Sequence, residues 1–473
     1  MRRRALLIPL AALLAGYAGP GSRRVTGALQ VLTATLPAGA MLLARLGRAA
    51  REPGRDGPQA RGSQGASTVT LLVPARDEAP VIAQLVADAA AARSAPMALT
   101  VVDDGSVDGT GDLAAAAIEA HVLGREASVI RLPAPSGSKA AALRAASAAP
   151  GVVVVLDADA RLTRGFVERA RAAARPDGVA QARRRMLRPA GRGARAWWAR
   201  ALAFAQDGEQ AVDDQIARAR FALGGAAEFR GDGMVIGTEA LEALGGWPAD
   251  ALCEDLELAT RWYLHAGRGV PRPRDLEVWE QPVLSVRSLL AQRLRWAEGA
   301  VRRDVRLVVP ASLDARVPLR RRAEVVGYAS QAVLPWAVLG IALRASGDRW
   351  MPARRRGRRA GGERGASVSA ASARRLLAAL TVGYGSAAVI LAWSALEDGL
   401  PAPAARLPQA RFAPLPRLVR AVAVAVFAGL WPLVLPAAWL RVARTPGPTR
   451  FVRTPHISPD AFSEPGPPQT PRT

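Results

Sequence analysis

The sequence predicts an α/β domain with a mostly parallel sheet, covered by helices on both faces and flanked by transmembrane helices. Apolar runs of strand length recur between positions 68 and 156. They lack the polar alternation of a half-exposed sheet, which is typical of strands buried on both faces. Longer apolar runs, of the length that crosses a bilayer, lie on either side of this region. We therefore expect one soluble domain between two membrane regions.

The chain divides into five expected regions. The linker is rich in glycine, proline and charge, and the tail is rich in proline, which favours disorder there. The regions are an N-terminal membrane segment (1–47), the linker (48–67), the α/β domain (68–310), a C-terminal membrane region (311–445) with a basic loop (345–374), and a disordered tail (446–473).

Membrane spans are expected at 24–45, 376–396 and 418–440. Residues 5–19 form either a short span or a signal-like leader. Residues 325–343 form either a full crossing or a re-entrant or interfacial helix. A full crossing would place the basic loop outside, against the positive-inside tendency. We expect a multi-pass protein of the cell membrane with its soluble domain in the cytoplasm, which fits a chain whose single cysteine cannot form an internal disulfide.

The composition has drifted strongly toward arginine. The chain of 473 residues has a formal charge of +24 and no asparagine, and Lys139 is the only lysine among 64 lysine and arginine residues. Drift of this kind makes the net charge weak support for an anionic partner. Lys139 stands against the drift in "SGSKAAALR". Either it survived by chance, or a tight loop needs an ammonium that is more compact than a guanidinium.

Acidic residues follow the expected strands. The first expected strand, 68–73, precedes a helical pattern over 80–92, and the second strand ends at Asp103 and Asp104. "ASVIRL" is the third expected strand. The fourth, in "GVVVVLDADA", ends at Asp157 and Asp159. In open α/β sheets, ligands bind beyond the carboxyl ends of the strands. "DDGS" alone is an ordinary turn. "DAD" is either a solvated strand exit or a hard-oxygen site for Mg²⁺ or Mn²⁺. Together the two motifs favour a binding site.

Two later motifs add polar groups. Glu254 and Asp255 stand at an expected helix start, where they either cap the helix or supply an ionised carboxylate. Gln292, Arg295 and Trp296 in "QRLRW" share one helical face. Arginine suits a diphosphate and tryptophan suits the apolar face of a sugar. The alternative for this helix is an amphipathic interfacial element.

In this order, the four motifs resemble those of membrane-embedded family 2 glycosyltransferases of the GT-A fold. That branch includes cellulose, hyaluronan and chitin synthases and ceramide glucosyltransferases, and the resemblance covers about residues 68–302. It implies that Asp103 and Asp104 contact uracil and ribose. It also implies that Asp159, with Asp157 beside it, holds an Mg²⁺ or Mn²⁺ ion on the diphosphate, and that Asp255 is the general base.

Further contacts follow from the same resemblance. It implies nucleotide-sugar contacts from Pro74, Glu78, Lys139, Asp157 and Arg295. Contacts to the acceptor or the diphosphate are implied for Glu254, Gln292 and Trp296.

The sequence also departs from the family pattern. Asp77, Arg144 and Asp232 stand where the family often has asparagine, and drift in a chain without asparagine is sufficient to explain them.

The resemblance implies an inverting glycosyltransferase that moves a sugar from a nucleotide-diphosphate sugar, such as a UDP-sugar, to a membrane lipid at the cytoplasmic face. A processive polysaccharide synthase is the alternative, although the few expected spans favour a single transfer. An alternative of another class is a basic membrane protein that binds anionic lipid or nucleic acid. Its support is residues 182–200, with seven arginines, Trp197 and Trp198. Because the strand-end acids repel phosphates, we expect no nucleic acid, and we expect a sugar donor, a lipid or glycan acceptor and membrane lipids as partners.

Overall fold

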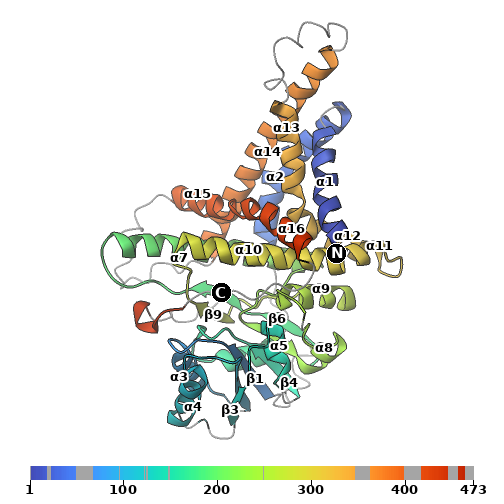
Figure 1. Cartoon of the computed structure of the whole chain (residues 1–473). Helices are drawn as coiled ribbons and strands as arrows, with labels where there is room; N and C mark the ends of the chain where they lie inside the picture. Colours follow the sequence, from blue (N-terminus) through green and yellow to red (C-terminus); the bar gives the residue numbers. More distant parts are fainter. Residues whose placement is uncertain are drawn as a thin grey trace.

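The chain forms an α/β part and a helical part that rises from one side of it (Figure 1). The computed structural model describes residues 2–18, 23–49, 68–94, 96–121, 123, 126–146, 150–248, 250–346, 363–398, 417–445 and 456–463. Two long helices, α7 (Ala194–Ala222) and α10 (Val286–Arg303), lie between the two parts. They form the layer on which the helical part stands.

The main sheet has six strands in the order β3-β2-β1-β4-β8-β6. The first four are parallel to one another, and β8 runs antiparallel to both β4 and β6. The predicted α/β fold with a mostly parallel sheet is confirmed. The strands are β1 (Thr68–Ala75), β2 (Met97–Asp103), β3 (Ala127–Arg131), β4 (Gly151–Val155), β6 (Val179–Gln181) and β8 (Met234–Gly237).

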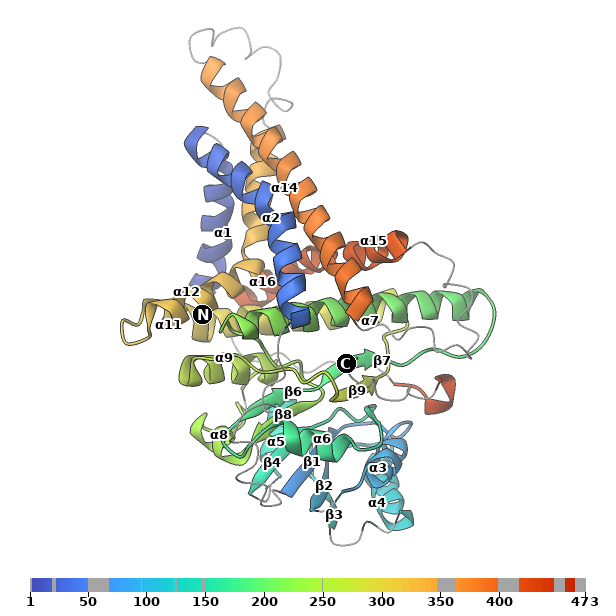
Figure 2. The same cartoon turned by 180° about the vertical axis from the view of Figure 1, so that it is seen from behind.

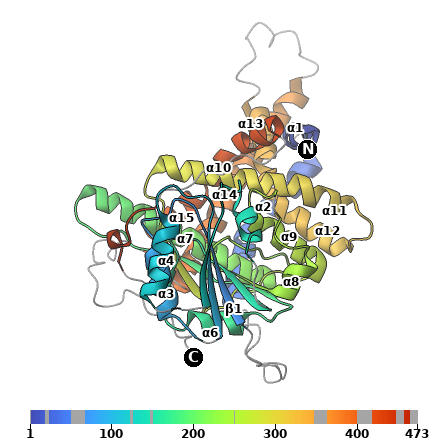
Figure 3. The same cartoon turned by 60° about the horizontal axis from the view of Figure 1, so that its bottom comes forward.

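Helices cover both faces of this sheet, and Figure 3 shows α3 and α4 on one side and α8 and α9 on the other. Alternate residues of one strand enter different cores: Val154 packs in the cluster that contains Leu85 of α3, and Val153 packs in the cluster that contains Trp262 of α9. This two-sided burial explains the unbroken valine run of β4. The helices are α3 (Ile82–Ala91), α4 (Thr110–Ala120), α5 (Lys139–Arg144), α6 (Phe166–Ala173), α8 (Thr238–Ala243) and α9 (Glu254–Ala266).

A second, three-stranded sheet lies between the main sheet and the long helices (Figure 2). It contains β5 (Arg161–Leu162), β9 (Glu277–Glu280) and β7 (Arg183–Met186) in that order. The arginines of β7 are largely buried in ion pairs, such as Arg185 with Asp207 of α7 at 3.0 Å. Three of the seven arginines of the stretch 182–200 therefore belong to an internal strand.

The helical part is a bundle with close helix contacts. A Cβ added at Gly340 of α13 would lie 2.1 Å from the Leu13 carbonyl oxygen of α1, and one at Gly383 of α14 would lie 2.4 Å from that of Thr33 of α2. Small residues at such crossings let helix backbones approach closely. The bundle consists of α1 (Arg2–Ala18), α2 (Arg23–Ala49), α13 (Leu334–Ser346) and α14 (Glu363–Asp398).

By length and composition, one described helix segment, Ala371–Leu396 of α14, is apolar enough to cross a membrane. It matches the expected span at 376–396. The run 325–343 spans a bent pair, α12 (Leu319–Ala329) and α13, with an angle of 54° between the two helices. If this pair is one broken span, the described residues contain two candidate membrane spans. The expected runs 5–19 and 24–45 lie largely in α1 and α2 and stay predictions as spans.

The expectation of one span at 418–440 is wrong in its geometry. That run is divided into α15 (Arg417–Ala428), η7 (Trp431–Val434) and α16 (Leu435–Arg444). The break lies at "GLWP", where glycine and proline both disfavour a continuous helix.

The expected domain boundaries stay predictions. Most of the linker and the core of the basic loop lie outside the described residues. Part of the expected tail, residues 456–463, is described and packs on the α/β part. Phe462 there is buried beside Leu187 and Trp279.

Candidate active site

The polar groups at the end of β2 are fixed by the backbone of two loops. Asp103 and Asp104 are both buried. The Ser106 amide donates to Asp103 Oδ1 at 3.0 Å, and the Ser136 amide donates to Asp104 Oδ1 at 2.6 Å. Pro74 pairs in register with Val102 on the neighbouring strand. "DDGS" is therefore a turn and also a rigid, acidic strand end next to the loop that leads to Lys139.

Lys139 connects two of the predicted motifs. It begins α5, whose N-cap residue Ser138 accepts a hydrogen bond from the Ala141 amide. Its Nζ lies 2.5 Å from Asp157 Oδ1 and 3.7 Å from Glu254 Oε1, and its side chain is only 15% exposed. Burial lowers the pKa of Lys139, but these two carboxylates outweigh it and hold the pKa above its usual value. The single lysine is thus a charged contact inside the site.

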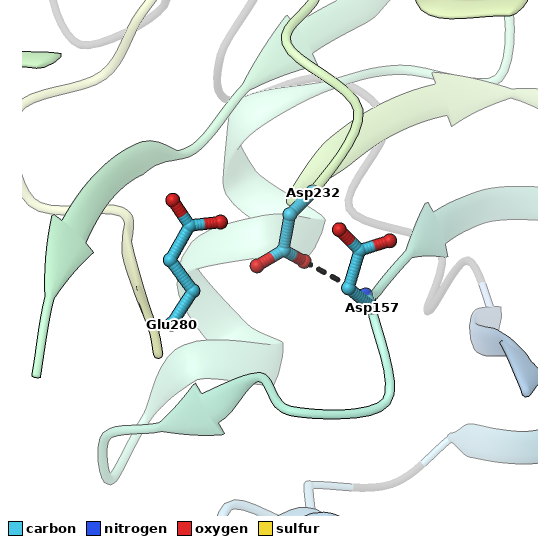
Figure 4. A group of neighbouring side chains, drawn as sticks. All are labelled: Asp157, Asp232 and Glu280. Atoms are coloured by element: carbon cyan, nitrogen blue, oxygen red, sulfur yellow. Dashed lines mark hydrogen bonds between the residues drawn. The ribbon is translucent and has the colours of Figure 1, made fainter. Parts of the chain in front are cut away.

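Asp157 belongs to a group of three carboxylates (Figure 4). One oxygen each of Asp157, Asp232 and Glu280 lies within 4.8 Å of the others. The Asp157 amide donates to Asp232 Oδ1 at 3.0 Å, whereas the buried Asp232 Oδ2 has no hydrogen-bond partner among the described residues. Arg184 donates to both oxygens of Glu280, at 2.6 and 2.7 Å.

This carboxylate group fits a hard divalent cation, because it offers several anionic oxygens of which one is buried and unpaired. Burial and the neighbouring Asp157 raise the pKa of Asp232 well above its usual value. Burial likewise raises the pKa of Glu280 to about 7, although Arg184 opposes the shift. The surroundings thus favour protonation of Asp232 and Glu280, whereas for Asp157 burial is outweighed by the charge of Lys139, which lowers the pKa.

Asp159, the second acid of "DAD", contacts other groups than Asp157 does. Its Oδ2 accepts the Gln281 amide at 2.8 Å and lies 3.7 Å from Nε2 of His456. The other ring nitrogen of His456 lies 2.8 Å from Glu78 Oε2. Burial lowers the pKa of His456, but Asp159 and Glu78 raise it to about 9. The two acids of "DAD" thus serve two adjacent polar groups.

Glu254 and Asp255 begin α9, and the N-cap residue Cys253 makes no side-chain capping bond. Glu254 is buried beside Lys139, and burial raises its pKa to about 7 although Lys139 opposes the shift. Asp255 is half-buried, and a Cβ added at Gly231 would lie 3.6 Å from its Oδ2. Burial also raises the pKa of Asp255, against the charges of Arg230 and Lys139. Of the two acids, Asp255 is the more accessible.

The "QRLRW" motif lies on α10, below the helical part. Trp296 packs against two guanidinium groups, Arg293 at 4.5 Å and Arg184 at 5.7 Å from the ring centre. Because Arg184 also holds Glu280, Trp296 is coupled to the carboxylate group. Gln292 and Arg295 are half-buried on the same helix. The opposite side of α10 packs on α16, so the helix is both a wall of the site and a base for the bundle.

Comparison with known families identifies the family of the chain. The sequence profile of "Glycosyl transferase family group 2" matches residues 152–395, which is about half of the chain. The profile of "Glycosyl transferase family 2" matches residues 70–229. The chain belongs to this glycosyltransferase family.

Among curated proteins, the glycosyltransferase is similar to a beta-monoglucosyldiacylglycerol synthase of Synechocystis sp., with 32% identity over 36% of this chain and 34% of that protein. A protein of the same name from Trichormus variabilis is 35% identical over 21% of each chain. The match thus spans about a third or less of these relatives.

Among solved structures, a mannosyltransferase from Pyrobaculum calidifontis in complex with GDP-Man and Mn²⁺ is similar, with a TM-score of 0.51 and 22% identity. The similarity covers 76% of this chain and 98% of that one, and it supports the GT-A-like fold.

Sequence reasoning missed several residues of this candidate site. Glu280 follows the rule that located the other acids, since it ends a strand, but β9 is too short to stand out. Asp232 was noticed only as a departure from a family loop. His456 lies in a segment expected to be disordered, and no local pattern connects it with Glu78 and Asp159.

Proposed function

We propose that this family member transfers a sugar from a nucleotide-diphosphate sugar to a hydroxyl group of a membrane lipid, with inversion at the anomeric carbon. The observation that carries the proposal is the position of Lys139, which contacts Asp157 at a strand end and lies near Glu254, the neighbour of Asp255. A cationic group for the diphosphate and a carboxylate for the acceptor are thereby held in one site.

In the proposed reaction, Asp103 and Asp104 bind the nucleoside of the donor, and Lys139 lies beside its diphosphate. The acceptor oxygen forms a bond to the anomeric carbon while the bond from that carbon to the diphosphate oxygen breaks. The electron pair of the broken bond leaves with the nucleoside diphosphate, and the proton of the acceptor hydroxyl passes to Asp255. Because the nucleophile and the leaving group are on opposite faces, the sugar configuration inverts.

We assign the cation-holding role to the acids after β4 and their neighbours. Asp157, Asp232 and Glu280 offer the carboxylate group described above, and Asp159 offers a further carboxylate oxygen near it, beside the His456 ring. An Mg²⁺ or Mn²⁺ ion bound there supplies positive charge that stabilises the leaving diphosphate.

The proposal places the bundle in the membrane as a multi-pass anchor, with the α/β part in the cytoplasm. Its support is the exposure of large apolar side chains on the bundle helices: Leu7 of α1 is 61% exposed, Leu42 of α2 57% and Val382 of α14 68%. Patches of this kind on a folded protein indicate contact with another apolar phase. Close glycine contacts between the helices also favour packing within lipid.

The names of the curated relatives suggest the first compounds to test. We propose diacylglycerol as the acceptor and UDP-glucose as the donor. The test incubates detergent-purified protein with each of UDP-glucose, UDP-galactose and GDP-mannose plus diacylglycerol and Mn²⁺, and identifies lipid products by mass spectrometry. A monoglycosylated lipid is the expected product. A water-insoluble polymer would favour the polysaccharide synthase, and no product with any donor or lipid would overturn the proposal.

A further inference from the structure

The first turns of α7, with the loop before them, form a surface that the sugar-transfer site does not use. We name residues 191–201, which are exposed or half-buried, the α7 overhang. Over 187–206 the sequence contains four arginines and no acidic residue. Trp197 and Trp198 are 46% and 49% exposed, with their rings stacked 6.4 Å apart. Two large aromatic side chains in this position are costly in water unless a partner covers them.

The overhang extends beyond the packed part of α7. From Phe204 onward the helix contacts α15 and α14: Phe204 packs in a cluster with Val424 of α15, a Cβ at Gly208 would meet Val424, and Gln215 bonds to Ser394 of α14. Figures 1 and 2 both show α7 running past α15 at one end. The overhang therefore lies in the layer between the α/β part and the helical part.

Helix α15, which packs against α7, also exposes apolar side chains. Leu418, Val419, Val422 and Val426 are between 41% and 61% exposed. Arg417 at the start of α15 lies over the Trp393 ring at 5.1 Å. Exposed aliphatic groups beside arginine and tryptophan are the composition of protein surfaces at the water–lipid boundary.

The charges of the overhang differ from those of β7, just before it. Arg183 and Arg185 are buried against carboxylates. In contrast, Arg192 and Arg195 are exposed, and no carboxylate in the described part of the chain pairs with them. Within the described residues 456–463, the acid of the C-terminal segment is Asp460, which accepts a hydrogen bond from Ser458. The overhang thus has a local excess of positive charge.

We propose that the α7 overhang binds the headgroups of anionic phospholipids, with Arg192 and Arg195 at the phosphates and Trp197 and Trp198 at the depth of the glycerol groups. The inference rests on the proposed function only for the presence of a membrane. Stacked aromatic rings with arginines also suit single-stranded nucleic acid. The exposed aliphatic side chains of α15, which packs against α7, favour lipid.

The test uses the full chain in nanodiscs of 70% phosphatidylcholine and 30% phosphatidylglycerol, with bromine atoms near the headgroup on only one of the two lipids. Brominated lipid quenches nearby tryptophan fluorescence. If phosphatidylglycerol gathers at the overhang, brominated phosphatidylglycerol quenches more per molecule than brominated phosphatidylcholine. This excess is expected to fall in 0.5 M NaCl, because salt screens the attraction.

Variants connect the excess quenching with the named residues. Trp197→Phe/Trp198→Phe removes the two reporting rings, and Arg192→Glu/Arg195→Glu removes the attraction, so both lose the excess. The loss expected is about fivefold in lipid preference for each arginine neutralised. The matched control Arg164→Glu/Arg175→Glu makes the same charge change at exposed positions of the α/β part and keeps the excess.

Equal quenching by the two brominated lipids in the unaltered chain would overturn the inference, as would an excess that survives in Arg192→Glu/Arg195→Glu. An excess abolished by a single-stranded oligonucleotide at low salt would assign the overhang to nucleic acid instead. The quenching measurement needs neither donor nor acceptor. A negative quenching result therefore leaves the sugar-transfer proposal intact, and a negative sugar-transfer assay leaves the lipid-binding inference intact.

Discussion

Nζ of Lys139 lies 2.5 Å from Oδ1 of Asp157, which joins the one lysine of the chain to the carboxylates that follow β4. The contact explains why an ammonium is kept in a chain that otherwise uses arginine. The lysine side chain is only 15% exposed, and a planar guanidinium needs more room than a compact ammonium.

The first prediction is that Lys139→Arg weakens donor binding by about tenfold or more, the loss of one charge-assisted hydrogen bond in a buried site. Binding of the nucleotide sugar by calorimetry measures the effect. The exposed substitution Arg164→Lys serves as the control and should bind the donor like the unaltered chain. Equal affinity in Lys139→Arg would remove Lys139 from the donor site.

The second prediction concerns pH. Asp255 must be ionised to accept a proton, and burial raises its pKa, so the rate should fall on acidification at a higher pH than for an ordinary aspartate. The positive charge of Lys139 lowers the pKa of both Asp255 and Glu254, which titrates at about 7. In Lys139→Met the acidic limb of the kcat/KM profile should therefore move to higher pH. A limb that stays in place, or moves down, would contradict this electrostatic coupling.

The third prediction tests the carboxylate group. If Asp232 helps to hold the cation, Asp232→Asn should lower Mn²⁺ affinity about tenfold or more, since even groups behind the ligands change affinity by that much. Electron paramagnetic resonance of free Mn²⁺ measures binding without any turnover. If Asp232 instead carries a proton next to Asp157, Asp232→Asn will bind Mn²⁺ as well as the unaltered chain.

The fourth prediction tests the bundle. Gly340→Ala places a methyl group against the backbone of α1 and should cost about 1–3 kcal/mol of stability. Gly327→Ala is the matched control, because nothing lies within 4 Å of a Cβ there, and it should stabilise α12 by about 0.5–1 kcal/mol. Thermal unfolding in detergent compares the two variants. A similar change in both would mean that α1 and α13 do not meet at Gly340.

The sequence was most informative where one physical requirement acts on a whole segment. The runs of β1, β2 and β4 had to be apolar on both faces, so the parallel sheet and the acids at its carboxyl edge were predictable. The arginine-rich strand β7 was not, because it is stabilised by ion pairs with Glu277 and Asp207, which are far away in the sequence.

The remainder of the site depends on tertiary contacts without a local pattern. Glu280 and Asp232 come beside Asp157 only through the arrangement of two sheets. His456 reaches the site because the Gln281 side chain bonds to both the amide and the carbonyl of Ile457, at 3.0 and 2.7 Å. The break in the run 418–440, in contrast, was visible in the sequence, since "GLWP" contains two residues that disfavour helix.

The most direct test of the account is the turnover of Asp255→Asn with the donor and lipid acceptor found by mass spectrometry. The account predicts that kcat falls by about 10²–10⁴-fold while donor affinity is kept, because the variant lacks only the group that takes the acceptor proton. Unchanged turnover in Asp255→Asn would contradict the assignment of the base and, with it, the proposed mechanism.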